Sequence, residues 1–187
     1  MLEVWLFRWH KWVCIEEFLK FEPDRQICFV TIILITFFSY FSTGAKISAS
    51  DISDSMADEA ARRAGELGLD AKFYTSDLES VTGKYDTVTC VDVAIHYPTD
   101  KMAEMVGHLC SLSDDRVIIS FAPKTWYYQF LKKIGELFPG PSKTTRAYLH
   151  EEEVVRNALT KAGFKVAREE MTGTNFYFSR LLEAKRV

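Results

Sequence analysis

Residues 84–98, KYDTVTCVDVAIHYP, decide the fold of this chain. They begin with a short, β-branched, nearly uncharged run, which is typical of a strand buried on both faces of a parallel sheet. The run ends in Asp92, His96 and Tyr97, and Pro98 then prevents further regular pairing. Titratable groups at the carboxyl end of such a strand are where open α/β sheets bind ligands. A second interpretation stays open here, in which the Asp and His only cap the turn after a core strand.

Length and composition limit the classes of protein to be considered. The chain has 187 residues, which is enough for one domain with a hydrophobic core. Its net charge is −3 and no basic stripe stands out, so nucleic-acid binding is not predicted. The four cysteines, at positions 14, 28, 90 and 110, form no CxxC pair. We therefore expect no metal site and a reducing compartment.

The first 43 residues have an unusual texture. Residues 1–26 combine several tryptophans with basic side chains, which favours an interfacial amphipathic anchor as one interpretation. Acids at Glu3, Glu16 and Glu17 argue against a transit peptide. The apolar run at 27–41 would reach only about 22 Å as a helix, short of the ~30 Å hydrocarbon core. We expect a buried helix or an interfacial segment there rather than a membrane span.

From Gly44 onward, strands alternate with helices, which predicts βαβ units and a parallel sheet. The expected strands are 46–50, 71–75, the strand within 84–98, and 116–121, followed by two closing strands at 165–168 and 175–183. The expected helices start at Ser53 or Ser55, after Pro98, and at 151. The first of them should turn one apolar side to the core, made of Met56, Ala57, Ala60, Ala61, Ala64 and Leu67. The insertion at 124–150 is expected to cover a site, or else to pack on the sheet as an amphipathic helix.

Several stretches together resemble one family. They are SASDIS at 48–53, SDLESVTGKYDTV at 76–88, IHYP at 95–98, the long ISFAPKT…GELFPGPSK…RAYLH block at 119–150, and NFYFSRLLEA at 175–184. The chain from Gly44 to its end looks like magnesium-protoporphyrin IX methyltransferases of chlorophyll biosynthesis. The resemblance implies a Rossmann-like class I sheet, and methyl transfer from S-adenosylmethionine (SAM) to a propionate of Mg-protoporphyrin IX. It also implies a chloroplast location, because the family works in the chloroplast or in photosynthetic bacteria; we identify no address in the chain itself.

The resemblance assigns roles to particular residues. In this fold an acid ending the second strand holds the SAM ribose hydroxyls, and an Asp after the third strand meets the adenine. The cofactor-binding residues it implies here are Asp51, Ile52, Asp77, Leu78 and Asp92. His96 is expected to orient the propionate or to ligate the porphyrin magnesium, with Tyr97 shaping the pocket; a turn-capping role for His96 is the alternative. The expected substrate-binding residues are Lys124, Trp126, Tyr127, Tyr128, Lys143 and Arg146, with solvated surface charge as the alternative for the last two. His150 is expected to be a neighbour of a helix cap rather than a ligand.

One element of the family pattern is missing. A GxGxG loop should follow the first strand, upstream of Gly44, yet no two glycines stand two apart anywhere in this chain. We expect an incomplete methyltransferase sheet that lacks the first strand and the glycine loop, because only about five residues separate Phe41 from Lys46. The expected division is an atypical segment at 1–43 and a partial methyltransferase domain at 44–187. Our hypothesis is that residues 1–43 come from an alternative start or a mis-spliced gene model.

Two other functions remain as alternatives. The chain could be an inactive fragment that keeps a porphyrin- or partner-binding surface but cannot hold SAM, which the missing glycine loop favours. An NAD-binding Rossmann module is disfavoured, because its glycine fingerprint is missing too. The implied partners are Mg-protoporphyrin IX, Mg-chelatase components of the same pathway and, through peripheral association, a membrane surface.

Overall fold

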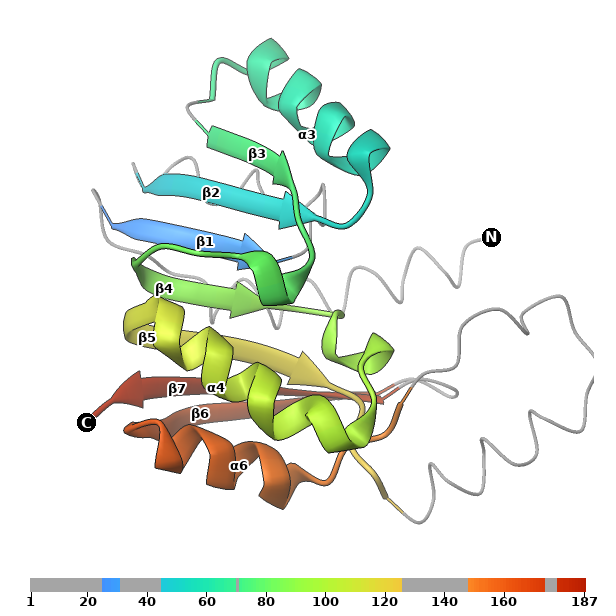
Figure 1. Cartoon of the computed structure of the whole chain (residues 1–187), viewed down its shortest axis with the longest axis vertical. Coiled ribbons are helices and arrows are strands. Elements are labelled where there is room, and N and C mark those ends of the chain that lie inside the picture. The colour runs from blue at the N-terminus through green and yellow to red at the C-terminus, as the bar shows by residue number, and fades with distance from the viewer. Residues whose placement is uncertain (1–24, 31–44, 70, 126–147, 174–177) are drawn as a thin grey trace, which may run out of the picture.

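The structure is a computed structural model that describes residues 25–30, 45–69, 71–125, 148–173 and 178–187 (Figure 1). The described strands form a single sheet in the order β3-β2-β1-β4-β5-β7-β6. Their bounds are β1 Gln26–Val30, β2 Lys46–Asp51, β3 Ala71–Thr75, β4 Tyr85–Cys90, β5 Ser113–Phe121, β6 Phe164–Gly173 and β7 Phe178–Arg186. The helices are α3 Asp54–Glu66, α4 Met102–Leu112 and α6 Glu152–Lys161, with 3₁₀ turns η1 Leu78–Ser80, η2 Ala94–His96 and η3 Thr99–Lys101.

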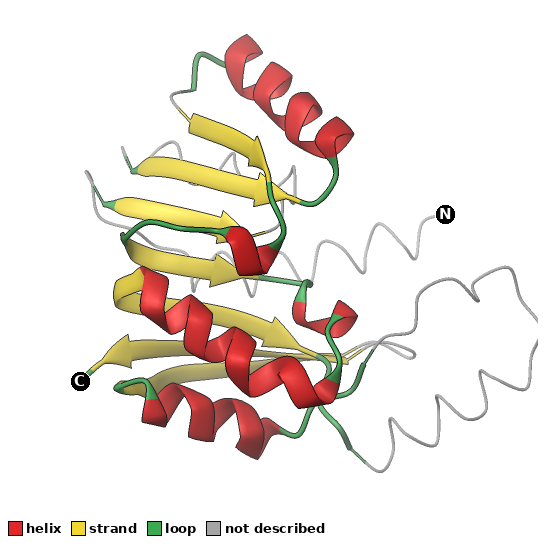
Figure 2. Ribbon diagram, viewed as in Figure 1, coloured by secondary structure: helices red, strands yellow, loops and turns green. Residues whose placement is uncertain are grey.

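The sheet is parallel from β3 to β5 and antiparallel at its other end. β1 pairs with both β2 and β4, and β4 pairs with β5, all in parallel. β7 then runs antiparallel between β5 and β6. Figure 2 shows the strands as one continuous twisted layer. The expectation of a Rossmann-like α/β fold is therefore confirmed.

Helices cover the sheet on two faces. Along β1, Cys28 and Val30 join the core beneath α4 and α6, whereas Ile27 and Phe29 join the core beneath α3. Successive strand residues point to opposite faces, so an uninterrupted apolar run such as ICFV suits a strand buried on both sides. Figure 1 shows α4 and α6 together over one face of the sheet. None of the helices that the structure describes is long and apolar enough to cross a bilayer.

The expected absence of the first strand is wrong. β1 stands in the middle of the parallel part, between β2 and β4. It includes the start of the apolar run, so residues 27–30 are strand rather than the expected buried helix or interfacial segment. Fifteen residues (31 to 45) therefore remain to reach β2, enough for a parallel crossover of about a dozen. The expected connection was too short because it was measured from Phe41, the end of the apolar run, rather than from Val30, the end of β1.

The sheet thus extends across the boundary expected between residues 43 and 44. The division into segments 1–43 and 44–187 stays a prediction, as does the origin of the first segment. Most of that segment, residues 1–24 and 31–44, lies outside the described residues, and so does the interfacial anchor expected within 1–26. The GxGxG position after β1 falls there as well.

The other expected elements are present, with some changes in detail. β5 starts three residues earlier than expected, because Ser113 already pairs with Tyr85 of β4. Along α3, only Ala57, Ala60 and Ala64 are buried. Met56, Ala61 and Leu67, which we placed on the same apolar side, are exposed. The helix therefore contacts the sheet through a narrow stripe of alanines rather than a broad apolar face.

Candidate active site at the carboxyl edge of the sheet

The carboxyl ends of β1 to β4 meet at one edge of the sheet, where their arrowheads point in Figure 1. From β1 the chain proceeds to β2 and β3 on one side, and then returns to β4 and β5 on the other. The strand order therefore reverses between β1 and β4. Such a switch point opens a crevice outside the carboxyl ends of the strands, which is where ligands bind in open α/β sheets.

Asp51 is the last residue of β2, at this edge. Its Oδ1 accepts a hydrogen bond from the Ser53 backbone N–H at 2.9 Å, which holds the turn into α3. The next side chain, Ile52, is 79% exposed. The end of β2 therefore offers a carboxylate beside an apolar side chain that faces solvent.

Asp77 follows β3 and caps η1. Its Oδ1 accepts a hydrogen bond from the Ser80 backbone N–H at 2.7 Å, and hydrogen bonds from Ser80 lower the pKa of this carboxyl. Leu78, which we expected beside an adenine ring, has its side chain buried in the core instead. Its contribution to the edge is therefore its backbone.

Tyr97 connects the end of β3 with the end of β4. Its half-buried side chain packs against the core cluster that contains Leu78. Burial, followed by the negative charges of Glu79 and Asp77, raises the pKa of Tyr97. The structure therefore brings Tyr97 to the same part of the core as Leu78, within reach of the charges of Asp77 and Glu79, although about twenty residues separate them in the sequence.

Asp92 has an uncommon backbone conformation directly beyond β4. Its φ of 62° lies in the left-handed region, and it is the only non-glycine residue of the described chain with positive φ. Its N–H donates to Ser120 Oγ at 2.9 Å, and the Ser120 hydroxyl donates back to Asp92 Oδ1 at 3.5 Å. Backbone strain of this kind is concentrated at functional sites.

His96 ends η2, and its side chain is exposed at the same edge. Its backbone N–H donates to Val93 O at 2.9 Å, which closes the turn. Asp51, Asp77, Asp92, His96 and Tyr97 thus all follow or end neighbouring parallel strands.

The residues expected to bind substrate are described only in part. The Lys124 ammonium donates to Glu151 Oε1 at 2.8 Å, and this contact lowers the pKa of Glu151. The remaining residues lie outside the described residues: Trp126, Tyr127, Tyr128, Lys143 and Arg146.

His150 directly precedes Glu151, the N-cap residue of α6, as expected, but it also makes a contact that the sequence did not predict. It is buried, and its Nε2 lies 2.8 Å from the carbonyl oxygen of Ala94 in η2. Burial lowers the pKa of this imidazole. The sequence carries no local signal for this contact, because the two residues are 56 positions apart.

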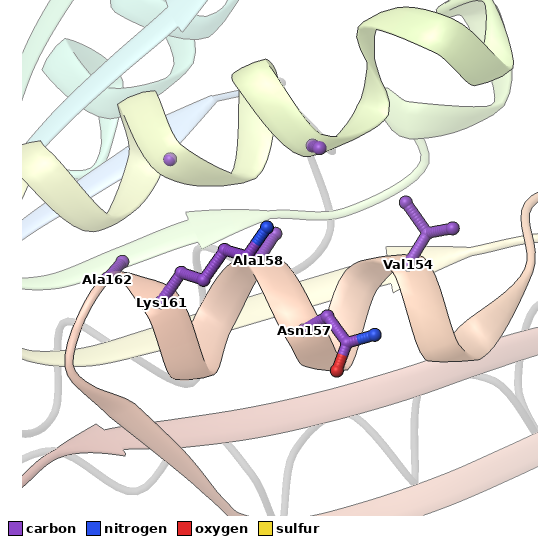
Figure 3. Close-up of a pocket in the computed structure, with 7 residues that line it drawn as sticks. Val154, Asn157, Ala158, Lys161 and Ala162 are labelled. Atoms are coloured by element: carbon purple, nitrogen blue, oxygen red, sulfur yellow. The ribbon is translucent and has the colours of Figure 1, made fainter.

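A groove of about 450 Å³ lies elsewhere, between α4 and α6 (Figure 3). Ala103 and Gly107 line it from α4, and Val154, Asn157 and Ala158 line it from α6. Among the described residues, none of those expected at the site borders this groove. The polar side chains among the lining residues are those of Asn157 and Lys161.

Comparison with known proteins identifies the family. The family model "Magnesium-protoporphyrin IX methyltransferase C-terminus" matches residues 90–186, which is just over half of the chain. This chain belongs to that family. A general methyltransferase-domain model matches residues 33–113.

Relatives of this methyltransferase family agree. The chloroplastic magnesium protoporphyrin IX methyltransferase of Arabidopsis thaliana is 59% identical over 144 residues, which are 75% of this chain and 46% of that protein. The magnesium-protoporphyrin O-methyltransferase of Synechocystis is 55% identical over 146 residues, 76% of this chain and 64% of its own length. The chain therefore spans about half to two thirds of these curated relatives.

A solved structure shows the same fold. The crystal structure of magnesium protoporphyrin IX methyltransferase from Synechocystis PCC 6803 with bound SAH superposes with a TM-score of 0.83 at 41% identity. The match covers 97% of this chain and 84% of that one. A second crystal structure of the same enzyme contains SAM, with a TM-score of 0.79.

Proposed function

We propose that this chain transfers a methyl group from SAM to a propionate carboxylate of Mg-protoporphyrin IX, giving the monomethyl ester. Membership of the methyltransferase family supports this function. The observation that carries it to this chain is the shared edge beyond β2, β3 and β4, where Asp51, Asp77 and His96 follow parallel strands.

SAM would supply an electrophilic methyl group on a sulfonium. In our proposal Asp51 accepts hydrogen bonds from the ribose hydroxyls and the exposed Ile52 packs against the adenine ring. Asp77 and the backbone of Leu78 form the far side of the adenine site, and Asp92 contributes a carboxylate beside the switch point. The carboxylates suit this role, because the two oxygens of each can accept hydrogen bonds from hydroxyl and amine groups.

The chemistry needs little acid–base help. A propionate has a pKa near that of Glu, about 4.3, so it is already anionic at neutral pH. The work of the protein is alignment, with the nucleophile about 3 Å from the methyl carbon and in line with the sulfur. We assign to His96 the orientation of the propionate or a contact with the porphyrin magnesium, and to Tyr97 the wall of the pocket.

The porphyrin would be held by the insertion that follows β5. We keep Trp126, Tyr127 and Tyr128 as stacking residues, and Lys143 and Arg146 as partners of the propionates. Lys124 belongs to the same proposal, but its ammonium would have to exchange Glu151 for the substrate.

His96 provides the first test of this function. We expect His96→Ala to lower the rate of monomethyl ester formation at least about 100-fold, as the loss of a positioning group does. Chromatography of the porphyrin products measures this rate. His108→Gln is the matched control, because His108 lies on α4 with its Nε2 3.1 Å from Val81 O. Normal turnover of the His96→Ala protein would remove the proposed role.

A second candidate function is an inactive fragment with a porphyrin- or partner-binding surface. The specific observation behind it is that residues 31–44, which follow β1, contain a single glycine, Gly44. Isothermal titration of the full chain with SAM separates the two. Micromolar binding supports the enzyme, and the absence of binding, with porphyrin still bound, supports the fragment.

Location and partners complete the proposal. We place the chain in the chloroplast, supported by the Arabidopsis relative that is named chloroplastic. We further propose peripheral membrane association through the aromatic residues near the N-terminus, and contact with Mg-chelatase components. Flotation of the full chain with anionic vesicles tests the first, and co-purification with the chelatase subunits tests the second.

A further inference from the structure

The tautomer of His150 follows from the hydrogen bond that its ring makes with Ala94. Nε2 lies 2.8 Å from the carbonyl oxygen of Ala94, and a carbonyl oxygen can only accept. Nε2 therefore carries the ring proton. The other nitrogen, Nδ1, is buried and has no hydrogen-bond partner in the part of the chain that the structure describes.

His150 belongs to a short segment, residues 148–150, that connects η2 with the end of β5. On one side the Tyr148 N–H donates to Ile95 O at 2.8 Å. On the other side the His150 N–H donates to Ala122 O at 2.8 Å, and the Lys124 N–H donates to His150 O at 2.8 Å. The 148–150 segment therefore holds the turn that carries His96 against a rigid strand.

The imidazole acts on the oxygen that closes this turn. Ala94 O accepts from the Tyr97 N–H at 3.1 Å and from His150 Nε2 at 2.8 Å. Both lone pairs of the oxygen are thus used. The bond from the Tyr97 N–H closes the turn, and the bond from His150 ties the Ala94 carbonyl to the 148–150 segment. His96 lies within this turn, between Ala94 and Tyr97.

We propose that His150 is a positioning residue of the methyl transfer reaction, which holds η2 so that His96 and Tyr97 face the edge of the sheet. This proposal rests on the proposed function in one respect, namely that His96 and Tyr97 take part in the methyl transfer. A leucine would fill similar space. What the imidazole adds is a donor that reaches Ala94 O from outside the turn.

Three substitutions of His150 in the full chain separate this role from simple packing. The amide nitrogen of Gln can take the place of Nε2, whereas that of the shorter Asn corresponds to Nδ1. Leu offers no donor. We therefore expect His150→Gln to rescue the contact, and His150→Asn and His150→Leu to lose it.

Amide hydrogen exchange is the first readout, and it needs neither SAM nor turnover. Losing a hydrogen bond of typical net strength should speed exchange of the Tyr97 and Tyr148 amides about tenfold in the Asn and Leu variants. In the Gln variant both amides should exchange at nearly the wild-type rate. Equal protection in all three folded variants, or a Gln variant that behaves like Leu, overturns the proposal.

Steady-state kinetics is the second readout. We expect the Asn and Leu variants to lose about 10- to 100-fold in kcat with an unchanged KM for SAM, because the Asp51 and Asp77 turns are untouched. If the wild-type chain has no methyltransferase activity, the proposed function fails, but amide exchange still decides the role of His150.

A third measurement requires no variant and therefore survives a failure of the variants to fold. Nitrogen-15 chemical shifts of the histidine side chains in the wild-type chain report the tautomer of His150. An Nε2–H tautomer supports the proposal. An Nδ1–H tautomer excludes the bond to Ala94 O and overturns it.

Discussion

At the scale of the residue, Asp92 has two separate properties to test: its left-handed backbone affects stability, and its carboxylate is assigned to cofactor binding. Its φ of 62° is unfavourable for most side chains, and Asn and Asp tolerate it best. We expect Asp92→Asn to keep the free energy of unfolding within about 0.5 kcal/mol, and Asp92→Ala to lower it by about 1 kcal/mol. Urea unfolding measures both. The two variants should weaken SAM binding alike, because both remove the carboxylate that we assign to the cofactor site.

The comparison of the two variants also tests whether the backbone conformation of Asp92, rather than its charge, determines the loss of stability. If Asp92→Asn is as destabilising as Asp92→Ala, the charge of Asp92, and not its backbone conformation, supports the folded state. Ser120→Ala gives an independent check, because it removes the hydroxyl that accepts the Asp92 N–H while leaving φ unchanged. We expect it to cost about 1 to 2 kcal/mol.

At the scale of the element, β1 depends on an anchor at its start. Asp86 of β4 accepts the Gln26 N–H at 2.7 Å through Oδ2 and the Arg25 guanidinium at 2.8 Å through Oδ1. The hydrogen bond from Gln26, with a smaller part from Arg25, lowers the pKa of Asp86. Because the folded pKa lies below the unfolded value of about 3.9, the stabilisation is present above pH ~4 and is lost as the pH falls below it.

Asp86→Asn should therefore destabilise the protein by about 1.5 kcal/mol at pH 7, and by much less near pH 3. Urea unfolding at the two pH values measures the difference. Asp100→Asn is the control, because Asp100 is an exposed carboxylate in η3. A destabilisation by Asp86→Asn that is the same at both pH values would show that the carboxylate charge has no part in holding β1.

This element also shows where sequence reasoning reaches its limit. Periodicity and caps predicted α3, α4 and α6, and the short segments alternating with them predicted β2 to β5, because local residues decide those structures. The prediction missed β1 because a 15-residue apolar run looks like a buried helix. The contact that places the strand, from Gln26 to Asp86, joins residues 60 positions apart. The acids at the strand ends could be found from the pattern. The contact of His150 with Ala94 and the left-handed Asp92 could not, since both depend on tertiary packing.

At the scale of the whole molecule, one buried ion pair joins the parallel and antiparallel parts of the sheet. Arg116 of β5 donates from Nε to Thr87 Oγ1 of β4 at 3.3 Å, and from Nη1 to Glu183 Oε1 of β7 at 3.3 Å. Glu183 is almost completely buried, and only a small part of the Arg116 side chain is exposed. A charge left in such a place without its partner is strongly unfavourable.

We therefore expect Glu183→Leu to lower the free energy of unfolding by about 3 kcal/mol, because it removes a buried carboxylate that faces the Arg116 guanidinium. For a chain of this size that corresponds to a fall of roughly 6–12 °C in the melting temperature. Replacing both residues, Arg116→Met with Glu183→Leu, should restore most of the loss, since two apolar side chains need no partner. Calorimetry of the two variants measures the coupling. A double variant as unstable as the single one would mean that the pair itself, and not the buried charge that remains in the single variant, explains the loss.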